Sequence, residues 1–151
     1  MKIFITTSLT VLFSLFFLIG IAQGSTNNKP LLFSKFPETI NCTATQLNGF
    51  FDGVQGQNIK VSFNNTLILA GNVKSNIVKY SNLQTVMIKL SAFSNILFTL
   101  SKRSDGHENI TYVGHLFDNA FADGYELKQI DKLNYKLIKI STDKILPTCN
   151  Q

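Results

Sequence analysis

Both histidines of the chain fall within residues 103–115, RSDGHENITYVGH, so this stretch is the first place to look for chemistry. An imidazole can bind a metal ion or act as a general base near neutral pH. His107 follows the turn-forming pair Asp105-Gly106, and His115 comes eight residues later along an alternating segment that predicts a strand. An extended segment of that length would separate the two side chains by roughly 26 Å. The two histidines are therefore not expected to bind one metal ion.

His115 has the better surroundings for catalysis, because acidic residues follow it closely in the sequence. A carboxylate that orients an imidazole can turn it into a general base, and Asp118 and Asp123 stand nearby. The chain contains no Gly-x-Ser-x-Gly or comparable nucleophile signature. A small hydrolase or metal-dependent enzyme centred on His115, with Asp118 or Asp123, is therefore the alternative interpretation, and the sequence leans away from an enzyme.

The segment 118–126, DNAFADGYE, raises the question of a calcium site, because hard cations prefer clustered oxygen ligands. An EF-hand loop needs alternating acidic residues before its glycine, whereas only Asp118, Asn119 and Asp123 precede Gly124 here. The pattern favours an ordinary polar turn into the next strand. We therefore expect neither a metal site nor a cofactor.

The first 24 residues have the pattern of a cleaved signal peptide. A short basic start, Met1-Lys2, is followed by an apolar run over Ile3–Leu18, and small residues then allow cleavage after Ala22 or Gly24. The run contains several hydroxyl side chains, whereas a permanent anchor needs about 20 apolar residues. The sequence therefore predicts a secreted or periplasmic protein with no stable membrane span after cleavage.

The chain has two cysteines, Cys42 near the start of the expected mature protein and Cys149 close to the end of the sequence. In an oxidising compartment, two such cysteines usually pair. We therefore predict a disulfide between Cys42 and Cys149 that joins the two ends of the domain, for which chain entropy predicts about 4–5 kcal/mol of stabilisation. A metal-thiolate site, a nucleophilic cysteine and an intermolecular bridge are the alternatives that remain open.

The positive charge is spread along the chain rather than gathered in one segment. The net charge is +5, yet the lysines stand apart and Arg103 is the one arginine. Nucleic-acid binders usually present a clustered basic face with arginine contacts. We therefore expect no nucleic-acid partner and place the lysines on the solvent faces of strands, where they limit edge-to-edge aggregation. A charge of this size is also compatible with anionic glycans or membrane surfaces.

One short helix is predicted near the start of the domain. Thr43, followed three residues later by Gln46, matches a capping box at a helix N-terminus. The helix should run for about two turns and end at Asp52-Gly53. A helix this short is unstable alone and must dock its apolar face, which consists of Leu47, Phe50 and Phe51.

From residue 58 onward, apolar and polar residues alternate with a period of two, which is typical of half-buried strands. Asn64-Asn65 predicts a hairpin turn between the first two strands, and 131–134 predicts one between the last two. The predicted strands cover 59–63, 66–73, 76–80, 85–90, 96–103, 109–117, 125–130 and 135–140.

This succession of strands predicts a single, mainly antiparallel all-β domain over 39–151, preceded by an extended lead-in at 25–38. Seven to eight strands can form a single curved sheet, a barrel-like roll or a sandwich. Gly71 and Gly114 lie inside strands, where a glycine often marks a bulge or bend, and this favours a curved sheet with the helix plugging one end. The predicted core comprises Phe63, Leu69, Val86, Ile88, Leu90, Ile96, Phe98, Leu100, Tyr112, Leu127 and Leu137.

The leading functional interpretation is an exported, non-enzymatic binding domain whose partner is another exported protein or a glycan. The candidate surface consists of the loops 104–108 and 118–124, because aromatic side chains in loops often anchor partners. The candidate binding residues there are Phe117, Phe121, His115 and Asp118. Three Asn-x-Thr sequons, at 41, 64 and 109, are glycan acceptors only in a host that glycosylates exported proteins.

Overall fold

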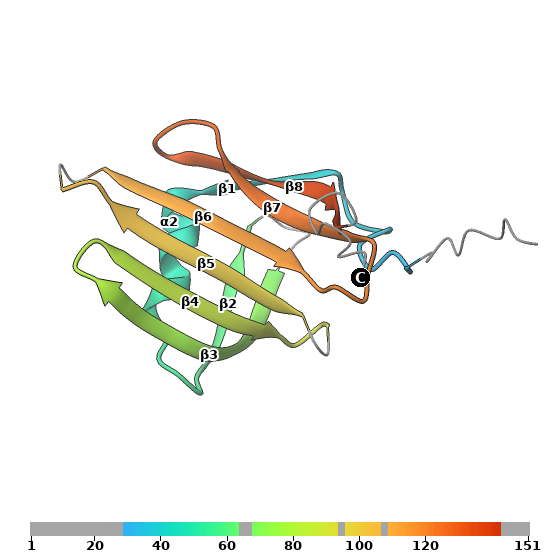
Figure 1. The fold of residues 1–151 in the computed structure, drawn as a ribbon, viewed down its shortest axis with the longest axis horizontal. Helices are drawn as coiled ribbons and strands as arrows, with labels where there is room; N and C mark the ends of the chain where they lie inside the picture. The colour runs from blue at the N-terminus through green and yellow to red at the C-terminus, as the bar shows by residue number, and fades with distance from the viewer. Residues whose placement is uncertain (1–28, 64–67, 94–95, 107–108, 143–151) are drawn as a thin grey trace, which may run out of the picture.

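The computed structural model describes residues 29–63, 68–93, 96–106 and 109–142, which form one short helix and eight strands (Figure 1). The expected signal peptide and Cys149 lie outside the described residues. In chain order the elements are β1 (Thr39–Thr43), the helix α2 (Ala44–Asn48) with its 3₁₀ continuation η2 (Gly49–Asp52), β2 (Asn58–Ser62), β3 (Ile68–Tyr80), β4 (Leu83–Leu90), β5 (Leu97–Ser104), β6 (Ile110–Phe117), β7 (Asp123–Gln129) and β8 (Asn134–Ser141). Within this part of the chain, no helix has the length and apolar character needed to cross a membrane.

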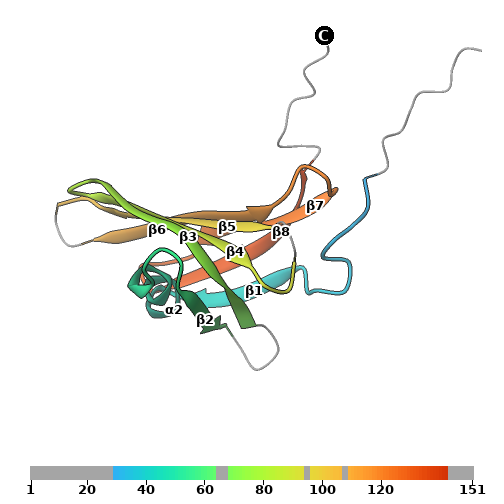
Figure 2. The same cartoon turned by 90° about the horizontal axis from the view of Figure 1, so that it is seen from below.

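All eight strands belong to one antiparallel sheet, in the order β1-β8-β7-β6-β5-β4-β3-β2. Consecutive strands from β2 to β8 are neighbours, and β1 pairs with β8 at the far edge. The sheet curves into a half-barrel, and Figure 2 shows it arching over α2, with β1 and β2 on the same side as the helix. The predicted antiparallel all-β fold with a single curved sheet and one short N-terminal helix is confirmed. There is no second sheet of the kind that a sandwich requires within the described residues.

The helix begins with the predicted capping box. The backbone N–H of Gln46 donates to the Thr43 hydroxyl at 3.2 Å, and the backbone N–H of Thr43 donates to Oε1 of Gln46 at 2.8 Å. These two bonds satisfy donors that a helix N-terminus otherwise leaves unpaired. The apolar face then packs into the concave side of the sheet, where the rings of Phe50 and Phe98 meet edge to face with centroids 5.1 Å apart. The predicted face is confirmed, since Leu47, Phe50 and Phe51 are all buried.

The side chain of Gln46 also joins the two edges of the half-barrel. Its Nε2 donates to the carbonyl oxygens of Ser62 at 2.7 Å and Phe63 at 3.1 Å, at the end of β2. Its Oε1 accepts from the end of β1 at Thr43. One amide group therefore links β1, α2 and β2, and we call this set of contacts the Gln46 clasp.

The two strands predicted at 66–73 and 76–80 form one continuous strand, β3, of 13 residues. A β-bulge between Val73 and Ser75 interrupts its pairing with β4 and allows the strand to bend without ending. Gly71, which was expected to mark a bulge or bend, lies just before it. A Cβ at Gly71 would come within 2.3 Å of the Lys89 carbonyl oxygen, so the glycine permits a close approach of β3 and β4.

The concave face holds the hydrophobic core, and all eleven residues predicted for the core are buried. The core also contains residues that the prediction omitted, among them Phe33, Ile40, Val73, Leu116, Tyr125 and Tyr135.

The predicted disulfide is not supported. Cys42 is buried with a free thiol, and Cys149 lies outside the described residues. Cys42 faces the core from β1, opposite Tyr135 of β8. Burial raises the pKa of its thiol to about 12, and a hydrogen bond with the backbone of Leu137 acts in the opposite direction. Cys42 therefore behaves as a small apolar core residue, because its thiolate would be poorly solvated.

We expect Gln46→Glu to destabilise the domain by about 2 kcal/mol at pH 7. The glutamate keeps the acceptor for Thr43, but it replaces the amide donor with an oxygen that faces two carbonyl oxygens. Urea unfolding measures the change. Gln57→Glu is the matched control, because the Gln57 side chain is exposed and acts as an acceptor for the Val54 N–H, a role that glutamate retains. Equal stability of the two variants would contradict a structural role of the Gln46 clasp.

We expect the Cys42 thiol to be unreactive in the folded protein and its burial to cost stability at alkaline pH. An unfolded cysteine ionises near pH 8.5, whereas the folded thiol has a pKa of about 12. The unfolded state therefore releases this proton first, and stability falls as pH rises from about 9 to 12, by up to about 1.4 kcal/mol per pH unit. Unfolding by urea between pH 7 and 10.5, in a Cys149→Ser background with and without Cys42→Ala, isolates the contribution of Cys42. Rapid labelling of Cys42 in the native protein at pH 8 would contradict its burial.

Candidate binding site at the open end of the half-barrel

The two loops proposed as one binding surface lie at opposite ends of β6. The hairpin that contains 104–106 precedes this strand, and the loop 118–122 follows it (Figure 1). An eight-residue strand spans roughly 26 Å. The described parts of the two loops therefore cannot contact the same small ligand, and each end of the half-barrel has to be considered by itself.

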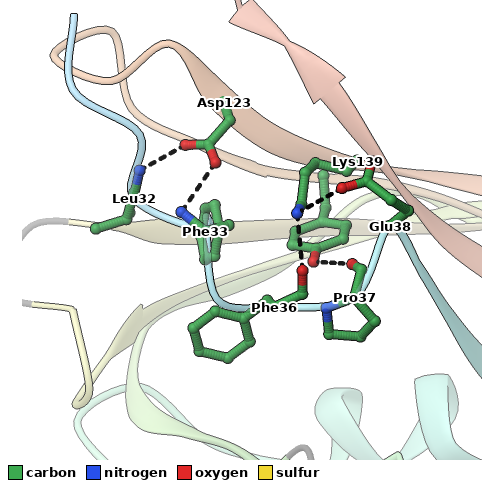
Figure 3. A network of polar contacts seen from close by, with 8 residues as sticks. Leu32, Phe33, Phe36, Pro37, Glu38, Asp123 and Lys139 are labelled. Carbon is green, nitrogen blue, oxygen red and sulfur yellow. Dashed lines mark hydrogen bonds and ion pairs between the residues drawn. The ribbon is translucent and has the colours of Figure 1, made fainter.

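The 118–124 end is occupied by the chain's own lead-in. The buried carboxylate of Asp123 accepts the backbone N–H groups of Leu32 at 2.6 Å and Phe33 at 2.9 Å (Figure 3). The backbone N–H of Ala122 donates to the carbonyl oxygen of Pro30 at 3.0 Å. Both oxygens of Asp123 are used in these bonds, so this residue holds the lead-in against β7.

Further contacts extend this attachment to β8. The ammonium of Lys139 donates to the Phe36 carbonyl oxygen and to the Glu38 carboxylate, both at 2.8 Å (Figure 3). The Tyr125 hydroxyl donates to the Pro37 carbonyl oxygen. Burial raises the pKa of Tyr125 to about 12, so this donor stays protonated over the neutral range.

The lead-in contributes to the core as well. Its described part, 29–38, makes a turn in which the Phe36 N–H donates to the Phe33 carbonyl, whereas an extended path over the surface was expected. Phe33 is 1% exposed, and its ring meets Phe36, Phe93 and Tyr125 at centroid distances of 5.2–5.7 Å. The lead-in turns inward, and does not run over the surface, because the Phe33 ring fills the mouth of the half-barrel.

His115 lies on the outer face of the sheet, whereas the carboxylate of Asp123 is buried against the lead-in. Its ring packs against Phe117 with centroids 4.8 Å apart, and Glu126 stands opposite on β7. Partial burial lowers the pKa of His115, and the negative charge of Glu126 opposes this effect. Glu126 itself pairs with Lys128 at 2.7 Å. His115 is thus an exposed imidazole, and no carboxylate among the described residues is hydrogen-bonded to it.

The structure does not bring the proposed catalytic residues together. In the part of the chain that it describes, no hydrogen bond or ion pair links His115 to Asp118 or Asp123. Asp118 accepts the Ala120 N–H at 2.8 Å and shapes its own turn. Among the described residues, no cluster of three or more His, Cys, Asp or Glu side chains is arranged to hold a metal ion.

The two phenylalanines proposed as binding anchors are both half-buried. Phe117 stacks on His115, and Phe121 packs against the hydrophobic core. The Phe121 carbonyl oxygen also accepts the Thr142 hydroxyl. Phe121 therefore helps to close this end of the half-barrel.

At the opposite end, the sheet opens between β6 and β7. The ladder between these strands contains only two residue pairs, His115 with Glu126 and Leu116 with Tyr125, and Figure 1 shows the β7–β8 hairpin bending away from β6. The backbone N–H of Tyr112 donates to the Tyr135 hydroxyl at 3.3 Å. A side chain of β8 thus takes the place of a bond between adjacent strands.

A pocket of about 630 Å³ lies at this opening, and we call it the hairpin-end pocket. Its walls come from the start of α2, the start of β6 and the β7–β8 hairpin, and its apolar lining includes Ala44, Ile110 and Leu133. Buried Tyr112 also lines it, and the Tyr112 hydroxyl donates to Oδ1 of Asn48 at 3.3 Å. The volume lies within the usual range for small-molecule sites.

Sequence reasoning missed this pocket, although one residue carried a signal. Leu133 is an apolar residue inside the polar turn 131–134, and it is 68% exposed. Single exposed apolar residues are common on protein surfaces, so this residue alone did not locate the pocket. Ile110 gave no such signal, because it belongs to an ordinary alternating strand.

Comparisons with protein families, with curated proteins and with solved structures found no match for this chain.

We expect Asp123→Asn to destabilise the domain by about 2–3 kcal/mol and to release the lead-in. The amide replaces one of two acceptor oxygens with a donor that faces a backbone N–H. Urea unfolding measures the stability, and hydrogen exchange at the amides of Leu32 and Phe33 should accelerate. Asp118→Asn is the control, because asparagine can accept the Ala120 N–H equally well. Unchanged exchange at Leu32 and Phe33 would show that Asp123 does not hold the lead-in.

Proposed function

We propose that this chain is an exported binding domain that takes a largely apolar ligand at the hairpin-end pocket. The main observation in support is the opening between β6 and the β7–β8 hairpin. Only two residue pairs join β6 to β7, and a pocket of about 630 Å³ lies beside them. Export rests on the signal-peptide pattern of the sequence over 1–24.

Beside polar residues such as Thr45, Thr111 and Gln129, the lining contains exposed apolar side chains that favour an apolar ligand. Ile110 and Leu133 are 42% and 68% exposed at the rim, so a ligand that covers them removes apolar surface from water. Tyr112 is the one aromatic side chain among the lining residues, and its ring is buried. Sugar binding usually uses an exposed aromatic face, so this lining favours an apolar molecule over the glycan considered from the sequence. The same pocket would also accept an apolar side chain of another exported protein.

We expect Nile red, an uncharged apolar dye, to bind the hairpin-end pocket with an increase in fluorescence. The double variant Ile110→Ser/Leu133→Ser should weaken binding at least tenfold, because it removes two apolar contacts at the rim. Fluorescence titration measures the dissociation constant. The matched control is Ile77→Ser/Val113→Ser, since these residues are 56% and 63% exposed and lie outside the lining of the pocket.

The control variant should bind the dye as the unmodified protein does. Equal losses in both double variants would mean that the dye adheres to exposed apolar surface in general. The absence of any saturable dye binding would reject the hairpin-end pocket as the site.

A further inference from the structure

A second pocket adjoins the hairpin-end pocket. It has a volume of about 420 Å³ and lies between the β3–β4 turn and β5, and we call it the turn pocket. Its apolar lining includes Val78, Tyr80 and Leu83. Ile110 lines both pockets, so they meet at the start of β6. The two pockets therefore share one wall residue, and a ligand that passes over Ile110 would contact both.

Lys102 stands where the two pockets meet. Its side chain lines the turn pocket, while its ammonium donates at 3.3 Å to Oδ1 of Asn48, a residue that lines the hairpin-end pocket. The ammonium lies 4.9 Å from the centroid of the Phe51 ring, so the side chain runs over the apolar end of the helix. Lys102 is half-buried and lies two residues after buried Leu100, on the same concave face of β5.

The positive charge of Lys102 has no counterion among the described residues. An ammonium has three N–H donors, and Asn48 accepts one of them. The Asn48 oxygen also accepts the Tyr112 hydroxyl, so its acceptor capacity is already shared. Two donors of a half-buried cation are thus left without a protein acceptor in the described structure, which favours an anionic group at this point.

The charges of the pocket walls support the same conclusion. Among the described residues that line the two pockets there is no aspartate or glutamate, whereas Lys132 lines one pocket and Lys102 the other. Arg103 lies next to Lys102 in the sequence but is exposed, and strand alternation directs it to the outer face. Phosphate sites usually combine several hydrogen-bond donors, often from an arginine guanidinium. A single lysine therefore suits a carboxylate better than a phosphate.

We propose that the ligand of this site is a long-chain carboxylate, with its head group at Lys102 and its hydrocarbon chain along Ile110 towards Leu133. This inference rests on the proposed function and specifies the ligand of the same pocket. The ammonium supplies a charge-assisted hydrogen bond to the carboxylate, and the apolar side chains of the hairpin-end pocket, Ile110 and Leu133 among them, contact the chain. The carboxylate contributes a negative charge that no described residue provides to Lys102.

The experiment compares palmitate with hexadecan-1-ol, which has a chain of the same length and no charge. Each competes with Nile red for the full-length mature protein at pH 7.5, below the concentration at which palmitate aggregates. We expect palmitate to displace the dye at a concentration at least tenfold lower than hexadecan-1-ol. Lys102→Met should remove this preference while leaving displacement by hexadecan-1-ol within twofold, because methionine keeps the apolar stem.

Two further variants separate charge from folding. Lys102→Arg retains the positive charge and should keep the preference for palmitate. Lys89→Met removes a lysine from the outer face of β4, where the residue is exposed, and should change nothing. If Lys102→Met loses dye binding altogether, the result for Lys102→Arg is the test. A preference for palmitate that persists in Lys102→Arg assigns carboxylate binding to the positive charge. A preference that is lost in Lys102→Arg overturns the inference.

The remaining outcomes distinguish the inference from the proposed function. Equal displacement by palmitate and hexadecan-1-ol, with dye binding still dependent on Ile110 and Leu133, overturns the carboxylate and keeps the apolar site. The absence of saturable dye binding rejects both. Binding of the protein to phosphatidylglycerol vesicles without binding of monomeric palmitate would assign the charge to a membrane surface and overturn the inference.

Discussion

The hydrogen bonds of the Gln46 side chain are the contacts on which the shape of this domain depends. An open curved sheet has two edges, and here the edges are β1 and β2, far apart in the sheet order. The amide of Gln46 accepts from Thr43 at the end of β1 and donates to the last carbonyls of β2. Because the donor and acceptor belong to one rigid group, the distance between the two edges is fixed by the position of the helix. A side chain therefore links the two edges that strand pairing would join in a complete barrel.

The position of the helix then determines which end of the half-barrel stays open. Leu47, Phe50 and Phe51 fill the concave face beneath β4 and β5, and Asn76 of β3 donates to the carbonyls of Phe51 and Gly53. At the other end, the lead-in supplies Phe33 as a plug. The lead-in is fastened there by the carboxylate of a strand residue, so this mouth is filled by the chain itself. Only the region around the β7–β8 hairpin is left without such a cover among the described residues.

The polar groups at the open end have a different character from those at the closed end. At the closed end, Asp123 and Lys139 both find backbone partners or an opposite charge within the chain. At the open end, Lys102 shares the oxygen of Asn48 with Tyr112 and has no carboxylate partner among the described residues. A charge that is satisfied locally stabilises a fold, whereas a half-buried charge without a partner is available to a ligand. This difference is why we place binding at the end that carries the loop 104–108, and not at the end that carries 118–124.

Local patterns in the sequence determined the helix, most strands and the core, because each depends on neighbouring residues alone. The spacing of Thr43 and Gln46 specifies the capping box, and the alternation of apolar residues specifies which side of each strand is buried. The break expected between 73 and 76 was replaced by a bulge, since pairing with β4 carries β3 through a short polar interruption. The sequence also indicated an antiparallel sheet, but it left the choice between roll and sandwich open.

Only the tertiary structure decided the site. Asp123 was a candidate catalytic residue because it follows His115 at a short distance along the chain, yet it binds backbone groups some 90 residues earlier. Lys102 and Asn48 are 54 positions apart and meet because the curved sheet brings β5 over the end of the helix. No local pattern encodes such a meeting. The sequence by itself determined the strands, the helix and their buried faces. The curvature of the sheet decided which distant polar groups face one another, because contacts between distant segments depend on how the whole sheet bends.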